Sequence, residues 1–328
     1  MGSYHYRPRW VQWIIIVIVV PGCATRGLVI DVEVKQHELP ESVELAQTPF
    51  YPQEDYQCGP AALATLLVES GVNVNAQELV AQVYIPERRG SLQIEMLAAT
   101  RTAGRLAYLI QPEPVAVLAE IAAGRPVLVL QNVGLKIAPL WHYAVIVGYE
   151  AATNSLILRS GVTKRRIITA PKFARSWRAS ENWAMIALRP GEMPAMPIEA
   201  DYLRAAAALE AVGHTDGAQA AFAAAVDTWP ESSAAWFGMA NAHYASGDLI
   251  DAEQIYRQLL EWGPDDAAIL NNLAQVLLDQ NRCTEASETI GRASRQSLAL
   301  ELQEAISDTR AAIVNRCDEK RSAVSAGS

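Results

Sequence analysis

The stretch PFYPQEDYQCGPAALATLL, residues 49–67, places a single cysteine, Cys58, at the start of an alanine-rich segment that is typical of a helix. Pro60 follows two residues later, and proline is well tolerated in the first turn of a helix. The N-terminal end of a helix presents unpaired N–H groups and the positive end of the helix dipole, which stabilise a thiolate over a thiol. The stretch therefore predicts a helix-borne thiol that can serve as a nucleophile.

The segments around this helix predict an α+β domain over residues 46–190. Four amphipathic helices come first, over residues 59–71, 75–84, 91–104 and 113–124, and Asn75 and Ser91 are expected to begin two of them. Short runs rich in Val, Ile and Leu follow at residues 125–133, 141–150, 155–161, 165–170 and 183–190. Helices followed by a meander of strands favour an antiparallel sheet packed against helices.

Beyond a proline-bearing linker at residues 191–198, the chain repeats with a period of 34 residues. Large, small and turn residues recur in step at Tyr202, Trp236 and Leu270, at Ala218, Ala252 and Ala286, and at Gly213, Gly247 and Asn281. That period and pattern resemble tetratricopeptide repeats. Three units fit residues 199–232, 233–266 and 267–300, followed by an expected capping helix at 301–317 and a flexible tail at 318–328.

Residues 1–22 predict an export signal of the lipoprotein type. Arg7 and Arg9 precede an apolar run of eleven residues, 10–20, which is too short to span a bilayer. Gly22 directly before Cys23 resembles a bacterial lipobox, in which the cysteine is lipidated and begins the mature chain. The resemblance implies a tether over residues 23–45 and a lipid anchor in the cell envelope, at the outer membrane and facing the periplasm. An ordinary cleaved signal with an incidental cysteine is the alternative.

The remaining cysteines divide into a pair and a single thiol. Cys283 lies at the turn of the third repeat and Cys317 at the end of the expected cap, so a helix hairpin can bring them together. An oxidising compartment permits a disulfide between them, and two unpaired buried thiols are the alternative. Cys58 then has no partner, and an odd thiol in an exported protein points to a function.

A catalytic thiol needs a base, and His142 is the candidate. Of the five histidines, His5 lies in the export signal, His37 in the tether, and His214 and His243 in the repeats. His142 stands at the start of the expected strand HYAVIVGY. A cysteine on a helix and a histidine on a strand, far apart in sequence, form the arrangement of papain-like enzymes.

The segments PQEDYQCGPAALATLL, GSLQIEML, GRPVLVL and WHYAVIVGYE together resemble the papain-like peptidases that cut bacteriocin leaders after a double glycine. The likeness is greater to their stand-alone lipoprotein relatives that carry tetratricopeptide repeats. The resemblance implies that Cys58 is the nucleophile, His142 the base and Gln53 the side chain of the oxyanion hole, with Gln57 as the second choice. Loss of one oxyanion donor typically costs about two to three orders of magnitude in rate.

The sequence departs from that family at the third catalytic position. The family's acid follows the histidine by one hairpin within an Asp-Pro pair, whereas Ser160 and Gly161 stand here. A serine can accept a hydrogen bond from the imidazole but brings no charge. Asn132, on the preceding strand, is another candidate, and Asn154 lies in the intervening turn. A Cys–His dyad, a weakly oriented triad and a retired peptidase all stay open, because a dyad is chemically adequate for a thiol nucleophile.

Charge narrows the range of partners. The net charge of −9 becomes −11 without residues 1–22, which disfavours nucleic acid as a partner. One cysteine and one histidine fall short of a zinc ligand set, so no metal or cofactor is expected. Residues 199–300 carry a net charge of −10 and residues 159–189 one of +7, which suggests that the repeats bind a basic protein or dock on that basic segment.

Three functions are compatible with these features. The first is an exported cysteine peptidase whose repeats recruit a peptide or protein. The second uses the same pair of residues to hydrolyse cell-wall peptides. The third is a non-catalytic adaptor in which the peptidase fold is a binding platform, and the missing aspartate favours it.

Overall fold

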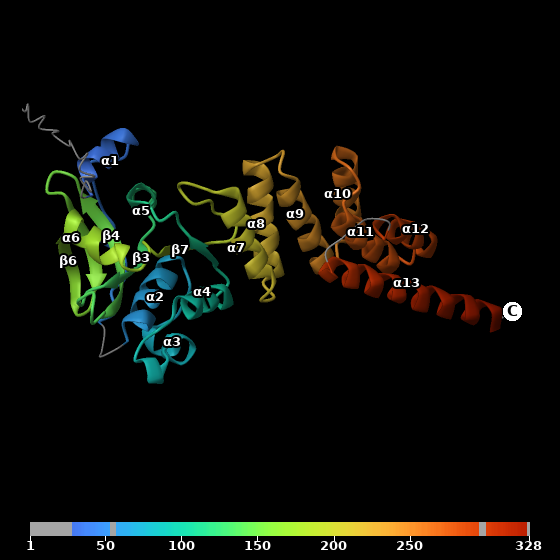
Figure 1. Ribbon diagram of the computed structural model, residues 1–328, viewed down its shortest axis with the longest axis horizontal. Coiled ribbons are helices and arrows are strands. Elements are labelled where there is room, and N and C mark those ends of the chain that lie inside the picture. The colour runs from blue at the N-terminus through green and yellow to red at the C-terminus, as the bar shows by residue number, and fades with distance from the viewer. Residues whose placement is uncertain (1–27, 53–56, 295–299, 327–328) are drawn as a thin grey trace, which may run out of the picture.

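The computed structural model describes residues 28–52, 57–294 and 300–326. The described part of the first domain holds one antiparallel sheet and its covering helices (Figure 1). The helices are α1 (Ile30–Gln36), α2 (Cys58–Glu69), α3 (Ala76–Val83), the 3₁₀ turn η1 (Pro86–Arg88), α4 (Gln93–Thr102), α5 (Pro114–Ala122) and α6 (Ala170–Arg178). The strands are β1 (Ser42–Glu44), β2 (Leu106–Leu109), β3 (Val127–Asn132), β4 (Trp141–Glu150), β5 (Ser155–Ser160), β6 (Thr163–Thr169) and β7 (Ala184–Leu188).

The sheet runs in the order β2-β7-β3-β4-β5-β6, and β1 pairs with the end of β4 beyond its pairing with β3. Side chains of successive strand residues point to opposite faces, so each face has its own core. Helices α2, α3 and α4 pack on the face that carries Leu128, Tyr143 and Val145. Helices α1, α5 and α6 pack on the face that carries Val129, Ala144 and Ile146.

The starts of two helices test the expected capping residues. Asn75 caps α3, because its side chain accepts from the Glu78 amide at 3.0 Å and Glu78 reaches back to form a capping box. Ser91 does not cap α4, which was the expectation; Leu92 takes the cap position without a side-chain hydrogen bond. The Ser91 hydroxyl instead lies against Gly59 at the start of α2.

The expected tether differs from the structure over its described part. Ile30 and Val34 lie one helical turn apart on α1 and are fully buried in the first domain. Residues 42–44 then form β1, and Val43 pairs with Tyr149. Two apolar residues on one helix face and a strand of three residues suffice to attach the segment, and a segment this short gives little periodic signal in sequence.

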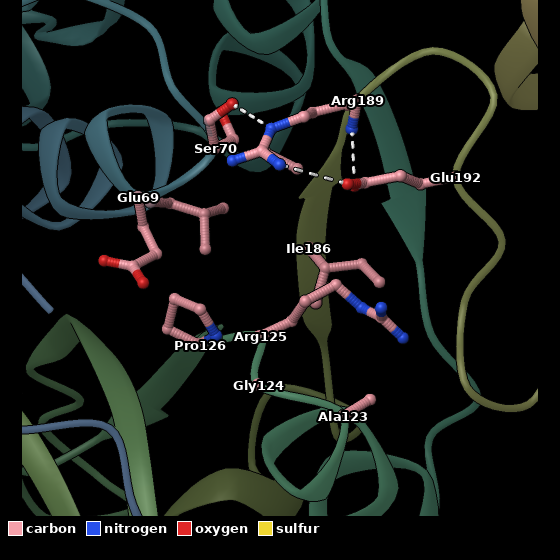
Figure 2. A pocket seen from close by; sticks show the side chains of 11 residues that line it. Glu69, Ser70, Ala123, Gly124, Arg125, Pro126, Ile186, Arg189 and Glu192 are labelled. Carbon is pink, nitrogen blue, oxygen red and sulfur yellow. Dashed lines mark hydrogen bonds and ion pairs between the residues drawn. The ribbon is translucent and has the colours of Figure 1, made fainter.

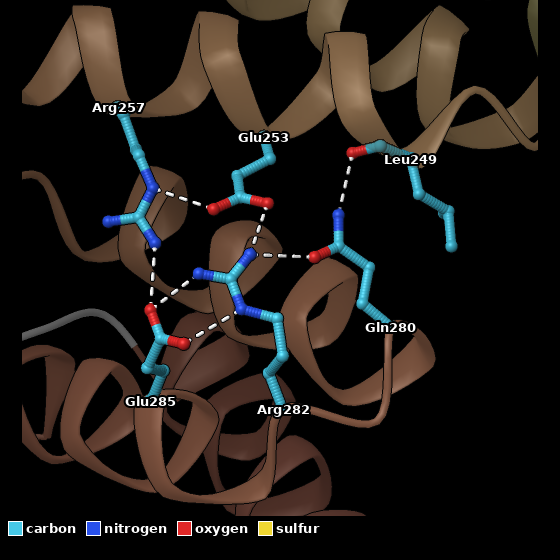
Figure 3. Close-up of polar contacts among 6 residues, drawn as sticks. All are labelled: Leu249, Glu253, Arg257, Gln280, Arg282 and Glu285. Atoms are coloured by element: carbon cyan, nitrogen blue, oxygen red, sulfur yellow. Dashed lines mark hydrogen bonds and ion pairs between the residues drawn. The ribbon is translucent and has the colours of Figure 1, made fainter.

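The C-terminal part contains the six paired helices expected of three repeats, within the described residues. They are α7 (Glu199–Glu210), α8 (Thr215–Thr228), α9 (Ser233–Ser246), α10 (Leu249–Trp262), α11 (Ala267–Asp279) and α12 (Cys283–Ala293). Arg282 joins the last two repeats through Glu253 at 2.6 Å and Glu285 at 2.6 Å (Figure 3). Such a charge network supplements the apolar contacts between neighbouring repeats.

Helix α13 (Leu300–Ala326) closes the array and continues past the expected end of the cap into the segment expected to be a flexible tail. Ile306 and Ile313 are buried against the last repeat. The sulfur atoms of Cys283 and Cys317 are bonded to each other, which ties α12 to α13. No helix in the described ranges combines the length and the apolar character needed to cross a membrane.

The two domains share one apolar core, so the segment between them is not a free linker. Tyr108 on β2 packs against Tyr202 on α7 with ring centroids 6.5 Å apart, and its hydroxyl accepts from the Ile198 amide at 3.2 Å. The Ala195 amide donates to the buried Glu120 carboxylate at 2.7 Å. Helix α7 therefore covers β2, which is an edge strand of the sheet.

The docking of the repeats on the basic segment, considered above, does not occur in this structure. Strand β6, which carries Lys164, Arg165 and Arg166, is the edge opposite to β2. The repeats extend away from it at the other end of the molecule (Figure 1). The reason is apolar matching, because aromatic and aliphatic side chains of β2 and α7 provide a joint that charge alone does not.

Candidate active site

Cys58 is the first residue of α2 and is half-buried. Burial raises the pKa of its thiol, and this effect is partly offset by the backbone amides of Tyr143, Gly59 and Cys58 itself, which lower it. The Tyr143 amide belongs to β4, so the sulfur reaches the strand at the residue that follows His142. The helix dipole alone does not overcome burial here, and Cys58 is a neutral thiol at pH 7.

Gly59 is what allows other side chains to approach the cysteine closely. A Cβ atom at this position would lie 2.1 Å from Ser91 Oγ and 2.6 Å from Ser91 Cβ, so only glycine fits. Ser91 Oγ is buried and has no hydrogen-bond partner among the described residues. Tyr143 adds a further link, because its hydroxyl donates to the Ser91 backbone oxygen at 3.4 Å.

His142 is the second residue of β4, and its Nε2 lies 2.9 Å from Ser160 Oγ on β5. Ser160 thus lies beside His142, as expected for the residue that one hairpin connects to it. Burial, and to a smaller extent the positive charge of Arg166, lower the pKa of His142 to about 4. The imidazole is consequently neutral at pH 7.

Arg166 reverses the electrostatics that a carboxylate would provide at this position. Its Nη1 donates to Ser160 Oγ at 3.4 Å, so the same hydroxyl contacts both the guanidinium and His142. Ser160 is only 3% exposed, so its hydroxyl is shielded from water although the Arg166 side chain is exposed. A negative charge beside a histidine favours imidazolium, whereas a positive charge disfavours it.

Alternation along β4 places His142 on the face of Ala144 and Ile146, opposite to Tyr143. Gln131 lies directly across from His142 in the register with β3, and its amide bonds Ser176 on α6 at 2.7 Å. Within the residues that the structure describes, no hydrogen bond joins Cys58 to His142. Both residues nevertheless line one cleft.

That cleft has a volume of about 860 Å³, enough for several residues of an extended peptide. Its walls are formed by side chains of α2, α4, β3, β4 and the loops that connect them. They include Cys58, Ser91, Leu92, Gln93, Leu130, Val133, Pro139, Leu140, Trp141, His142 and Tyr143, with Arg88 and Arg89 also lining it. From the loop between β3 and β4, the cleft is lined by the exposed apolar residues Val133 and Leu140.

The other candidates named from sequence have separate positions. Gln53 lies outside the described residues, and Gln57 is the N-cap residue of α2 without a side-chain cap bond. Asn132 does not contact His142, because its Oδ1 accepts from the amides of Gly134 and Leu140 and shapes the β3–β4 loop. Asn154 is also remote, since it bonds the backbone of Ile30 and Leu28.

Two residues of the site were not assigned to it from sequence. Ser91 enters through the space that Gly59 leaves, and a Gly after the cysteine was the only available hint. Arg166 enters through the pairing of β5 with β6, whose register shifts between Leu158 and Ser160. A single positive residue within a basic strand cannot be assigned to a site before that register is known.

A second cavity of about 230 Å³ lies where α2 ends, near the join to the repeats (Figure 2). Arg189 donates to the Ser70 backbone oxygen at 3.0 Å and pairs with Glu192 at 3.4 Å, while Arg105 donates to the same oxygen at 3.1 Å. These guanidinium groups satisfy the end of α2, which indicates a structural joint. No cluster of three or more potential metal ligands occurs in the described part of the chain.

Comparison with known proteins bears on both domains. The model of the Peptidase_C39 like family matches residues 45–185, and that of the tetratricopeptide repeat matches residues 209–271 and 244–299. The chain thus carries a C39-like peptidase domain followed by tetratricopeptide repeats, which confirms the resemblance and the fold class expected from sequence. A search of curated proteins found no match.

Several solved structures are similar to one or the other part. A putative C39-like peptidase from Bacillus anthracis shares 16% identity over 46% of this chain and 98% of its own, with a TM-score of 0.38. The peptidase domain of Streptococcus ComA, a bifunctional ABC transporter, shares 21% identity over 43% and 98%, with a TM-score of 0.35. YrrB, a tetratricopeptide protein with an unusual peptide-binding site, shares 20% identity over 35% and 57%, with a TM-score of 0.30.

Proposed function

From a chain that joins a C39-like peptidase domain to tetratricopeptide repeats, we propose a cysteine peptidase that binds an extended peptide in the cleft at the start of α2. Cys58 is its nucleophile and His142 its general base. The observation that carries the proposal is that both side chains line one cleft of about 860 Å³, with the Tyr143 amide directed at the sulfur. The repeats hold the peptide or a protein that delivers it.

The chemistry follows from which atoms are already engaged. His142 Nε2 faces Ser160, so Nδ1 is the nitrogen left to accept the Cys58 proton as the sulfur attacks the peptide carbonyl. The Cys58 amide and the Gln53 side chain stabilise the oxyanion, and the imidazolium returns its proton to the departing amine. Water, deprotonated by His142, then hydrolyses the thioester and releases the acid product.

The resting state sets a barrier to this chemistry. A free cysteine has a pKa of roughly 8.5, and burial raises that of Cys58, while the pKa of His142 is about 4. Moving the proton from thiol to imidazole therefore costs at least on the order of 6 kcal/mol before any help from substrate. We expect slow turnover that depends on the substrate to exclude water and orient the pair.

The electrostatics around His142 favour a second function, a peptide-binding platform without cleavage. Ser160 and Arg166 stand where a carboxylate would support the imidazolium. A cleft of the same shape with an unreactive Cys58 thiol would still present peptides to a partner bound to the repeats. The cell-envelope location, the lipidation of Cys23 and the role of Gln53 remain proposals from sequence, because all of them fall on residues outside the described ranges.

Alkylation of Cys58 by iodoacetamide from pH 4 to pH 9 tests the two functions, with His142→Ala for comparison. Cys58 is the one thiol outside the disulfide in the described part, and Cys23→Ser removes the other cysteine from the measurement. Faster alkylation in the presence of a peptide library, lost in His142→Ala, supports the peptidase. Peptide binding that protects Cys58 without product formation supports the platform.

A further inference from the structure

Five exposed cationic side chains lie along β6 and α6. They are Lys164 and Arg166 on the strand and Lys172, Arg175 and Arg178 on the helix. None of the five forms an ion pair with a carboxylate within the described part of the chain. Arg165 differs, because it is paired with Glu44 at 2.8 Å. We call the five residues the basic face.

Helix α6 has a strict division between its two sides. Phe173 and Trp177 are buried and stacked on each other with centroids 5.4 Å apart, fixing one side to the sheet. Lys172, Arg175 and Arg178 follow each other at intervals of three residues, so they share the exposed side. Because the sheet covers the aromatic side, α6 offers only its cationic side to a partner, and clusters of Lys and Arg on such a helix attract anionic lipid headgroups.

The start of α6, at one end of the basic face, lies close to the point where the described chain begins. Asn154 accepts from the Ile30 amide at 2.9 Å and donates to the Leu28 backbone oxygen at 3.2 Å. The backbone oxygen of the same Asn154 accepts from the Ala170 amide at 2.8 Å, at the first residue of α6. Cys23, the expected lipidation site, thus stands only five residues before Leu28, or at most about 18 Å of chain.

Negative charge is concentrated at the other end of the molecule. Residues 199–300 carry a net charge of −10, and these repeats extend away from β6 and α6 (Figure 1). Asp31 on α1 is paired with Lys35 at 2.8 Å, and Glu181, three residues after Arg178, is the acid nearest in sequence to the basic face. An approaching anionic surface therefore meets cations on one end and is repelled by the other.

We propose that the basic face binds the anionic phospholipid headgroups of a membrane and holds the first domain against it, with the repeats directed outward. Each cation near an anionic surface strengthens binding by about fivefold at low ionic strength, and the effect fades within a Debye length of about 10 Å. Reversing three of the five charges is accordingly expected to weaken binding by at least about 100-fold.

The test is co-sedimentation of the full chain, as Cys23→Ser to remove the lipid, with vesicles of phosphatidylethanolamine and phosphatidylglycerol or of phosphatidylcholine alone. The variant Lys172→Glu/Arg175→Glu/Arg178→Glu is compared with Arg88→Glu/Lys136→Glu/Arg310→Glu, which makes the same change in net charge at exposed positions elsewhere. Circular dichroism shows whether each variant is folded. We expect salt-sensitive binding to the anionic vesicles that only the α6 variant loses.

Equal loss in both variants overturns the proposal, because net charge rather than the basic face would then decide binding. Equal binding of the unsubstituted face to both kinds of vesicle also overturns it, since the apolar run at residues 10–20 would account for that result. Tighter binding of the basic face to an acidic polypeptide or to DNA than to anionic vesicles would assign it to a different partner. If the α6 variant unfolds, Lys164→Glu/Lys172→Glu provides the same comparison with fewer changes.

Discussion

Replacing Ser160 by aspartate tests whether the third position controls the chemistry of the cleft. Ser160 Oγ lies 2.9 Å from His142 Nε2, so an aspartate carboxylate at this position falls within contact distance of the imidazole. An opposite charge at that range raises the pKa of a histidine by about 1 to 3 units. From about 4 in the wild type, the pKa of His142 is expected to rise to roughly 5–7.

The expected gain in reactivity follows from the same shift. Each pKa unit is about 1.4 kcal/mol, so the thiolate–imidazolium pair becomes about 1.4 to 4 kcal/mol less costly. The carboxylate also pairs with Arg166, which removes the positive charge that now opposes protonation. Alkylation of Cys58 by iodoacetamide at pH 7 should therefore accelerate by about tenfold or more.

Ser160→Asn is the matched control, because it has the shape of aspartate without the charge. The pKa of His142 is measured by proton NMR titration of its C2–H signal, and the alkylation rate is measured on the same samples. If the aspartate and asparagine variants have the same His142 pKa, then geometry rather than charge limits the site and the electrostatic reasoning is refuted.

Three further predictions concern pH and stability. The pKa of His142 in the folded chain is about 4, below its unfolded value of roughly 6.5, so the unfolded state takes up the proton first as the pH falls. The contribution of His142 to the free energy of unfolding is therefore fully present above pH 6.5 and falls by up to about 3 kcal/mol as the pH drops to 4. Urea unfolding of the wild type and His142→Gln at pH 7 and pH 4 measures this loss, which the variant should lack. Removing the link between Cys283 and Cys317, 34 residues apart, with Cys283→Ser should cost about 4 kcal/mol in thermal unfolding of the repeats, and a reducing agent should have no effect on that variant. Gly238→Ala should destabilise the repeats by about 1 to 3 kcal/mol, because its Cβ would lie 2.2 Å from the Phe222 ring. An unchanged midpoint of thermal unfolding would instead show that α8 and α9 can move apart to accommodate the added methyl group.

Local signals accounted for the parts of the fold that were predicted correctly. Asn75 and Glu78 stand three residues apart and cap α3 without help from distant residues. The 34-residue period fixed the paired helices of the repeats, because each unit has to bury the same positions against its neighbour. His142 and Ser160 were placed as neighbours because a single hairpin connects their strands.

The parts that were missed depend on contacts between distant segments. Ser91 looked like a helix cap, but its hydroxyl instead fills the space that Gly59 leaves at the start of α2. Arg166 affects His142 only through the strand register of β5 and β6. Residues 30–44 read as a tether, since their burial depends on a groove formed by β4 and α5 that has no counterpart in their own sequence.

The core that passes from β2 into α7 has a consequence for how the gene can be divided. A shortened gene that stops at residue 190 would encode a sheet whose edge, at Leu106–Leu109, has lost the helix that covers it. Such an open edge recruits strands from other chains, so the shortened product should aggregate rather than fold on its own. A gene fusion that joins the first domain to another protein must therefore include α7. The boundary at which the two parts of this chain can be separated lies within the repeats.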